Sequence, residues 1–344
     1  MKDLSIIVPV YNVEKYIRAC VESIFRQGID ENRFEVIIVN DGTKDRSMEM
    51  IADIIKEHDN IIVINQENQG LSVARNNGIE AAKGEYILMP DSDDLLIENS
   101  IPILLEQAIA SHADLVIADF LRMNNEEIEH IQTIPQKVFE MKEKTGEELF
   151  LEDLNPYECF VWRTLYRKEF LISNSIKFIP GIYIQDVPFT HECYIKAKKC
   201  IRTNRLMNIY RKGHESATFK FNKKKSKDFC TAIASTWKLT YNDGLSSNVH
   251  QKLGNDIYIS FSKMVSIVVR DIDKKAERAE IVDFLRQLAP DLRFKHGTKQ
   301  RAVSFLVTNM PHLYLQIRYL YANYFEDIIR PYLMNRFRRP KTNT

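Results

Sequence analysis

The sequence predicts an α/β protein whose mostly parallel sheet is flanked by helices, followed by a helical C-terminal region. Two observations indicate the sheet. Short apolar runs alternate with segments of helical periodicity through about the first 120 residues, and polar side chains follow the ends of these runs. A third observation, a mostly helical pattern after about residue 225, indicates the C-terminal region. The chain has 344 residues, enough for about two domains, and a globular composition with 44% hydrophobic residues.

The first strand is expected at residues 5–10, a continuous apolar run of the kind that is buried on both faces of a sheet. Apolar residues then recur at helical spacing between Ile17 and Phe25. The same alternation continues, with strands expected at 34–39, 61–64, 86–89 and 115–118 and helices at about 47–57, 71–82 and 101–111. Short strands separated by helices are typical of βαβ units and a parallel sheet.

The second half of the chain has a different pattern. Residues from about 122 to 145 are polar and are expected to form a loop, and residues 146–215 mix aromatic and charged side chains. Helices are expected at about 226–242, 249–270, 276–288 and 312–335.

Composition excludes several classes of protein. The 48 Lys and Arg residues balance 47 Asp and Glu residues, which argues against a nucleic-acid partner. The five cysteines form no CxxC motif, so we expect reduced thiols and no zinc ribbon. No stretch approaches 18 apolar residues, and the first apolar run is too short for a signal peptide. These features predict a cytoplasmic protein without a membrane span.

Polar residues follow three of the expected strands. Tyr11 and Asn12 follow the first strand, Asp41 follows the second, and Asp91 and Asp93 follow the fourth. In open α/β sheets the ligand binds outside the carboxyl ends of the strands. The sequence therefore predicts that these side chains line one cleft.

The segment Asp91-Ser92-Asp93 is a candidate metal site. Two carboxylates one residue apart point the same way from an extended segment, where they can share a hard divalent cation with diphosphate oxygens. The alternative interpretation is a cluster of caps ahead of the next helix, and Asp94 is expected to be the capping residue even if the other two bind a metal.

Two further segments also have a purely structural interpretation. Residues 40–43 could be only a turn, which Asp-Gly favours, and residues 70–78 only a capped helix with a buried alanine face. Arg75 lies in that helix, and its guanidinium would suit the neutralisation of phosphate charge.

Taken together, these segments resemble the family-2 glycosyltransferases. The resemblance is specific over residues 4–120, where the order and spacing of five segments match, namely 5–12, 39–43, 70–76, 84–87 and 91–94. It continues more weakly to about residue 218, through 162–166, 181–186, Tyr210, Arg211 and Ser216. Beyond about residue 225 no resemblance is found.

The resemblance implies the nucleotide-diphospho-sugar transferase fold called GT-A, and it implies roles for individual residues. Pro9, Tyr11 and Asp41 would form the uridine pocket, with Asp41 accepting from the uracil ring N–H. Arg75 would lie on the nucleotide side, Asp91 near the ribose and the metal, and Asp93 would bind Mn²⁺ or Mg²⁺ directly. Arg211 would contact phosphate oxygens. His214 could be a second metal ligand or a solvated loop residue.

The resemblance also makes Asp186 the candidate catalytic base. The family has a Glu-Asp pair at this point, whereas this chain has Gln185-Asp186, so an amide replaces the first carboxylate. The alternative role for Asp186 is the N-cap of a helix from Val187 to about Ala197, with Pro188 in its first turn.

The resemblance implies a metal-dependent glycosyltransferase that moves a hexosyl or N-acetylhexosaminyl group from a UDP-sugar, with inversion at the anomeric carbon. The acceptor would be a hydroxyl of a saccharide or of a lipid-linked acceptor in surface polysaccharide synthesis. Residues 1–220 would form the catalytic domain, with a nucleotide-binding half at 1–120 and an acceptor-binding half at 121–220, and residues 221–344 the helical region.

Three alternatives stay open. A nucleotidyltransferase would need a Gly-rich triphosphate loop, which residues 10–13 lack. A non-catalytic nucleotide-sugar-binding module could lose Asp93 or Asp186, and this chain keeps both. A helical interaction protein would explain only the C-terminal region.

The C-terminal tail is basic and follows a tyrosine-rich segment. Five Lys and Arg residues lie beyond Asp327 without a further acid. One interpretation is contact with the inner face of an anionic membrane, where a lipid-linked acceptor would lie. The other is a helix packed on the protein with a frayed basic end.

Overall fold

The computed structural model describes residues 2–131, 134, 139–213 and 221–322. The chain divides into two compact units. The first unit comprises Met1–Gly181 and Gln185–Glu215, and the second comprises Ile182–Ile184 and Ser216–Thr344. The predicted tail contact at residues 329–344 lies outside the described residues, as do His214 and Ser216.

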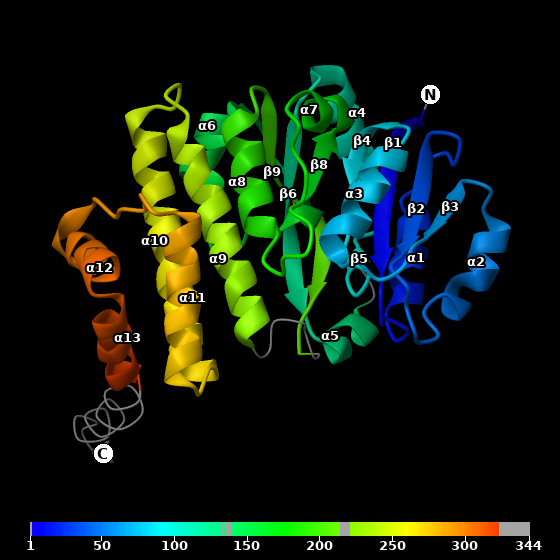
Figure 1. Ribbon diagram of the computed structural model, residues 1–344. Coiled ribbons are helices and arrows are strands. Elements are labelled where there is room, and N and C mark those ends of the chain that lie inside the picture. The colour runs from blue at the N-terminus through cyan, green and yellow to red at the C-terminus, as the bar shows by residue number, and fades with distance from the viewer. Residues whose placement is uncertain (1, 132–133, 135–138, 214–220, 323–344) are drawn as a thin grey trace, which may run out of the picture. The chain divides into compact units, whose positions relative to one another are not determined.

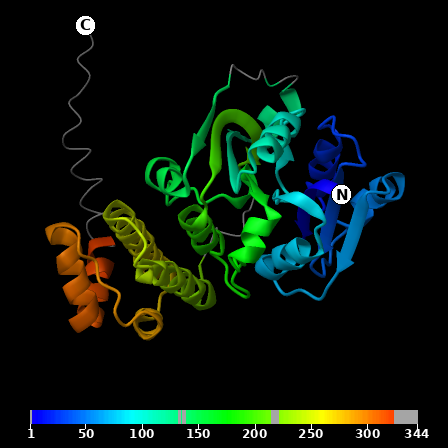
Figure 2. The same cartoon turned by 90° about the horizontal axis from the view of Figure 1, so that it is seen from above.

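The first unit contains a mixed, mostly parallel sheet flanked by helices, which confirms the predicted fold class (Figures 1 and 2). Its strands run in the order β3-β2-β1-β4-β8-β6-β9-β5, and β7 pairs with β9. The strand bounds are β1 Lys2–Val10, β2 Phe34–Asn40, β3 Ile61–Asn65, β4 Gly84–Leu88, β5 Leu95–Leu96, β6 Leu115–Met123, β7 Met141–Lys144, β8 Thr164–Arg167 and β9 Cys200–Arg211. All five predicted strands are present.

Strand directions divide the sheet into two parallel parts joined by one antiparallel strand. β1 is parallel to β2 and β4, and β2 is parallel to β3. β6 is parallel to β9, while β8 runs antiparallel to both β4 and β6. β5 and β7 are antiparallel to β9.

The helices of the first unit connect and cover these strands. Their bounds are α1 Ile17–Phe25, α2 Ala52–Glu57, α3 Leu71–Ala81, α4 Ile101–Ser111, α5 Asn125–His130, α6 Gly146–Glu148, α7 Lys168–Ser173 and α8 Asp186–Lys196. Shorter 3₁₀ turns lie at Glu49–Ile51 and Val161–Arg163, and a π-helical turn at Leu149–Asp153. The expectation of a loop over 122–145 is therefore partly wrong, because α5 and β7 lie there; the Asn124 capping box stabilises α5 in spite of its polar sequence.

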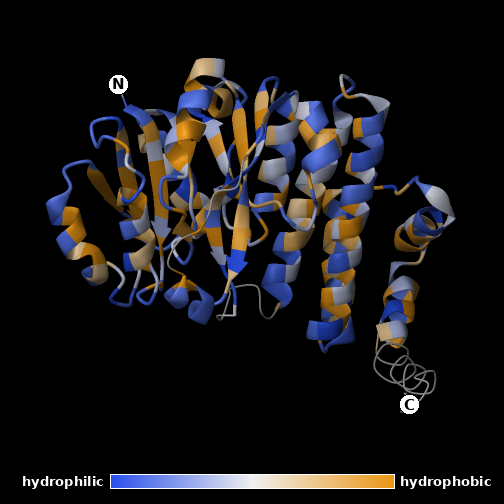
Figure 3. Ribbon diagram, turned by 180° about the vertical axis from the view of Figure 1, so that it is seen from behind, coloured by the Kyte–Doolittle hydropathy of each residue, from blue (hydrophilic) through white to orange (hydrophobic). Residues whose placement is uncertain are grey.

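Burial on both faces explains the continuous apolar run of β1. Leu4, Ile6, Val8 and Val10 enter a core cluster with residues of α1 and α4. Ile7 points to the other face and packs against α3, where a Cβ on Gly78 would lie 2.3 Å from the Ile7 Cγ2 atom. Figure 3 shows the hydrophobic colouring along the central strands. A strand of this kind fixes the middle of the sheet.

The sheet brings the predicted cleft residues to one edge. β2, β1 and β4 are adjacent and parallel, so their carboxyl ends at Asn40, Val10 and Leu88 lie at the same edge. The segments that follow these strands carry Tyr11, Asp41 and the acidic loop formed by Asp91, Asp93 and Asp94.

The second unit is helical. Its helices are α9 Lys223–Lys238, α10 Ser247–Asp271, α11 Lys275–Leu288, α12 Gly297–Asn309 and α13 Pro311–Leu320, with a 3₁₀ turn at Leu239–Tyr241. The helix α12 was not predicted. No described helix is both long and apolar enough to cross a membrane. All five cysteines are buried free thiols, as predicted.

Candidate active site

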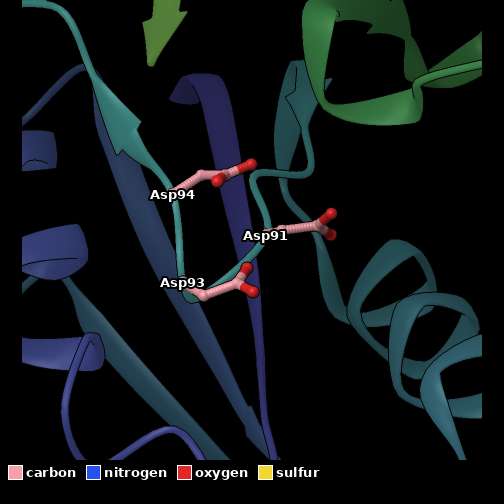
Figure 4. A group of neighbouring side chains, drawn as sticks. All are labelled: Asp91, Asp93 and Asp94. Atoms are coloured by element: carbon pink, nitrogen blue, oxygen red, sulfur yellow. The ribbon is translucent and has the colours of Figure 1, made fainter. Parts of the chain in front are cut away.

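The acidic loop after β4 brings three carboxylates together. Their ligand oxygens, one from each of Asp91, Asp93 and Asp94, lie within 4.8 Å of one another (Figure 4). One oxygen of Asp94, Oδ2, is buried without a hydrogen-bond partner. Hard oxygen donors at this spacing suit Mg²⁺ or Mn²⁺, so the residues present fit a divalent cation.

Asp94 does not cap a helix, and this expectation is wrong. The next helix, α4, begins at Ile101 with Ser100 at its N-cap position. Asp94 directly precedes β5, which pairs with β9, and its Oδ1 atom accepts a 2.8 Å hydrogen bond from the Arg211 backbone N–H. The only sequence signal for Asp94 as a third candidate metal ligand was the run of carboxylates, which fitted a helix cap equally well.

Burial and, to a smaller extent, neighbouring negative charges raise two pKa values in the acidic loop. Burial raises the pKa of Asp91 to about 7, and the neighbouring Asp93 and Asp186 add to the effect against the lowering influence of Arg75. Burial, together with Asp91 and Asp93, raises the pKa of Asp94 to about 9. Such a cluster is short of positive charge, and a bound cation would supply it.

Arg75 joins the acidic loop to the predicted base. Its side chain on α3 is fully buried, and its guanidinium donates to Asp91 Oδ1 at 2.6 Å and to Asp186 Oδ1 at 2.8 Å. The Arg75 Nε atom is buried without a partner. A buried guanidinium needs carboxylate partners, and the two acids supply them from segments separated by more than 90 residues of chain.

Asp186 is the first residue of α8, and Gln185 holds the N-cap position without a side-chain cap bond. The alternative role of Asp186 as an N-cap is therefore not borne out. The Asp186 side chain is 36% exposed, so a substrate can reach it, while partial burial raises its pKa and Arg75 opposes that rise. The arrangement suits a carboxylate that accepts a proton.

A second contact from α3 fixes the residue before Asp186. The Ser72 hydroxyl donates to Gln185 Oε1 at 2.6 Å, and both side chains are buried. Ser72 and Arg75 lie one turn apart on α3, so one helix face holds two successive residues at the start of α8. Sequence reasoning missed this pairing, because residues 72 and 185 carry no mutual signal.

The residues predicted for the uridine pocket lie at the ends of β1 and β2. Pro9 is buried and pairs with Val39, whereas Tyr11 is 43% exposed just beyond β1. Asp41 is buried, and its oxygens accept from the Gln66 amide and from the backbone N–H groups of Gln69 and Gly70, at 2.7 to 2.9 Å. Asp41 therefore also holds the loop that leads into α3.

Arg211 ends β9 and contacts the acidic loop. Its Nε atom donates to the Asp93 carbonyl oxygen at 2.8 Å, and another guanidinium nitrogen donates to Asn125 Oδ1 at 2.6 Å. Arg211 is 7% exposed, and its contacts with Asp93 and Asp94 hold the acidic loop in place. Its predicted contact with phosphate stays a prediction.

The chain is similar to known proteins in sequence and in fold. The profile of the family described as "Glycosyl transferase family 2" matches residues 5–173. The uncharacterized glycosyltransferase EpsJ of Bacillus subtilis (strain 168) is 32% identical over 218 residues, which cover 62% of each chain. Glycosyltransferase GlyG of Streptococcus pneumoniae serotype 4 is 31% identical over 216 residues, which cover 61% of this chain and 70% of GlyG.

Among solved structures, residues 1–349 of S. aureus TarS in complex with UDP match with a TM-score of 0.72. The match covers 94% of this chain and 91% of the TarS chain at 21% sequence identity, which shows a shared fold. The match to EpsJ spans less than two thirds of that relative's length. On its sequence match to the family profile and to GlyG, the chain belongs to glycosyl transferase family 2.

Proposed function

We propose that the chain transfers a sugar from a UDP-sugar to an acceptor hydroxyl, with a divalent cation and with inversion at the anomeric carbon. The observation that supports this most strongly is the bridge from Asp91 through Arg75 to Asp186. It holds a candidate metal-binding loop and a partly exposed carboxylate in one site, as transfer from a diphosphate donor requires. The structures of TarS with UDP and with UDP-GlcNAc support a nucleotide-sugar donor.

The nucleotide would lie at the carboxyl ends of β1 and β2. The exposed Tyr11 ring offers a flat surface for the base. Asp41 already accepts three hydrogen bonds, and a carboxylate has about four acceptor positions, so one remains for the uracil N–H. Calorimetry with UDP, GDP and ADP tests this assignment. We expect UDP to bind most tightly, and equal affinities would mean that the site recognises only the diphosphate.

Asp91, Asp93 and Asp94 would hold Mn²⁺ or Mg²⁺. When bound, the cation supplies positive charge to the departing diphosphate. The chain itself contributes the position of these carboxylates, because Arg211 braces the loop at Asp93 and Asp94 and Arg75 braces it at Asp91.

Asp186 would remove the proton from the acceptor hydroxyl as that oxygen attacks the anomeric carbon. Its burial raises its pKa, which strengthens it as a base, while Arg75 keeps it ionised and oriented. One in-line displacement inverts the anomeric centre and needs no covalent intermediate, so positioning and electrostatics provide the acceleration.

The acceptor would be a saccharide or a lipid-linked saccharide, used in surface polysaccharide synthesis at the cytoplasmic face of the membrane. Residues 121–220 would form the acceptor half of the catalytic domain, and residues 221–344 the helical region.

The experiment is UDP release from a panel of UDP-sugars, with Mn²⁺ and with excess EDTA. We expect metal-dependent release with one donor, increased by the correct acceptor. A binding module, the rival function, would bind a donor and release no UDP. Full release in EDTA would contradict the metal assignment.

A further inference from the structure

One face of α13 carries a stripe of exposed apolar side chains. Leu313, Ile317 and Leu320 are 40% to 55% exposed, and Tyr321, which directly follows α13 with a helical backbone, is 45% exposed. Their spacing of three and four residues places them on one side of a helix. The stripe is therefore one continuous apolar surface.

The stripe is not the face by which α13 packs on its own unit. Pro311, Tyr314 and Leu315 are the buried residues of α13, and the Tyr314 ring stacks 6.0 Å from the ring of Phe261 on α10. The fold thus uses one face of α13 for the helical core and leaves the apolar stripe exposed. The preceding helix, α12, adds Phe305, which is 60% exposed.

Charge in this region is segregated. From Leu292 to Phe325 the chain contains five Lys or Arg residues and no Asp or Glu, although the whole sequence has 48 basic and 47 acidic residues. Arg293, Lys295, Lys299 and Arg301 are exposed, whereas the Arg318 guanidinium donates to Ser266 Oγ on α10 at 2.6 Å, so four of the five cations lie where a ligand could reach them. Arg301 is exposed one turn before Phe305, so a cation and an aromatic ring share one face of α12.

We propose that the exposed faces of α12 and α13, here called the α12–α13 surface, dock on an anionic lipid bilayer. The apolar stripe would enter the headgroup region while the cations approach the lipid phosphates, as in helices that lie in the plane of a membrane. A second copy of the chain fits less well, because pairing this surface with itself would oppose cations with cations. The inference goes beyond the proposed transfer reaction and does not depend on it.

Flotation of the full chain with vesicles tests the proposal. The vesicles contain phosphatidylcholine alone or with about 30% phosphatidylglycerol. We expect binding to the anionic vesicles that falls at least tenfold between about 0.05 M and 0.5 M NaCl, because salt screens the cations. Ile317→Glu should reduce binding about tenfold, since it places a charge in the apolar stripe.

Gln107→Glu is the matched control. It adds the same charge at an exposed position of α4 in the first unit, outside the stripe, and should reduce binding no more than about threefold. UDP affinity and a thermal melt check that both variants remain folded. Equal losses in Ile317→Glu and Gln107→Glu, or no loss in either, would overturn the proposal.

Ile317→Trp gives a second measurement that does not rely on weakened binding. The two native tryptophans, Trp162 and Trp237, are buried, so a new signal that brominated lipid quenches would come from position 317. We expect a blue shift and quenching with anionic vesicles. Two results would overturn the membrane assignment. If sedimentation shows a dimer that Ile317→Glu dissociates, the α12–α13 surface is an interface between copies of the chain. If the chain binds an acidic protein and no anionic vesicle, the surface is a protein-binding site.

Discussion

Arg75 is the residue on which the candidate site depends most. It is a fully buried cation whose charge is balanced by Asp91 and Asp186, each about one third exposed. Removing one member of a buried ionic cluster leaves the remaining charges without a partner. The resulting loss of stability is larger than the net stability that the intact cluster provides. The same contacts that keep the fold stable therefore also set the distance between the acidic loop and the candidate base.

Arg75→Ala should lower the free energy of unfolding by about 2 to 3 kcal/mol, less than for a fully buried pair because both carboxylates are partly exposed. Urea denaturation measures this change. Arg18→Ala is the control, since it removes exposed ion pairs with Asp53 and Glu22, which water screens, and should lower the stability much less than Arg75→Ala does. Similar losses of unfolding free energy in the two variants would show that the ion pairs of Arg75 stabilise the fold no more than exposed ion pairs do.

Asp93→Ala should abolish metal-dependent UDP release while the protein stays folded. Asp93 lies in a surface loop, so its carboxylate adds little to core packing, yet it is one of three oxygen donors within 4.8 Å. Titration with Mn²⁺, followed by calorimetry, should show weaker binding. Unchanged Mn²⁺ affinity in Asp93→Ala would remove this residue from the metal site.

At the scale of the element, α3 links the sheet to the site. Its Gly78 face approaches β1, and its Ser72 and Arg75 side chains hold Gln185 and Asp186. A shift of α3 on the sheet would therefore move the candidate base, so the packing of Gly78 matters to the site as well as to the core.

Gly78→Ala should destabilise the protein by about 1 to 3 kcal/mol, because the new Cβ would lie 2.3 Å from Ile7 Cγ2. In an Ile7→Ala background, which removes that atom, the same change should stabilise by about 0.5 to 1 kcal/mol, since alanine favours a helix over glycine. A double-mutant cycle measures the coupling. Additive effects would mean that the contact between Gly78 and Ile7 does not limit packing.

Some strands and helices were predictable from the sequence and others were not. β1, β2, β4 and β6 were predictable because each contains a continuous apolar run, as a strand covered on both faces needs, and the half-buried edge strand β3 has a similar apolar run. β9 carries Arg202, Asn204 and Arg205 in its middle, which hides the strand pattern. α12 has only two buried residues, Ser304 and Val307, so the sequence shows little helical periodicity there.

The candidate site was predictable only in part. Asp41, Asp91 and Asp93 follow apolar strands, and the sheet geometry brings such positions together. The contacts of Arg75 with Asp186 and of Ser72 with Gln185 join residues 111 and 113 positions apart, and no local pattern encodes them. The role of Asp94 was missed because its pairing with Arg211 depends on β9.

At the scale of the whole molecule, the first unit carries the family profile and all the candidate site residues. The second unit carries the α12–α13 surface and has no residue in the acidic loop. We therefore expect substitutions in the two units to act separately, with the first set changing UDP affinity or turnover and the second set changing association with vesicles.

The central claim is that Asp186 is the base of a transfer reaction, and Asp186→Asn tests it most directly. The amide keeps the size of the side chain and cannot accept the proton. With the active donor and Mn²⁺, the account predicts that turnover falls about 10² to 10⁴-fold while UDP affinity changes less than about threefold. Turnover close to that of the wild type, with UDP binding lost instead, would contradict the account.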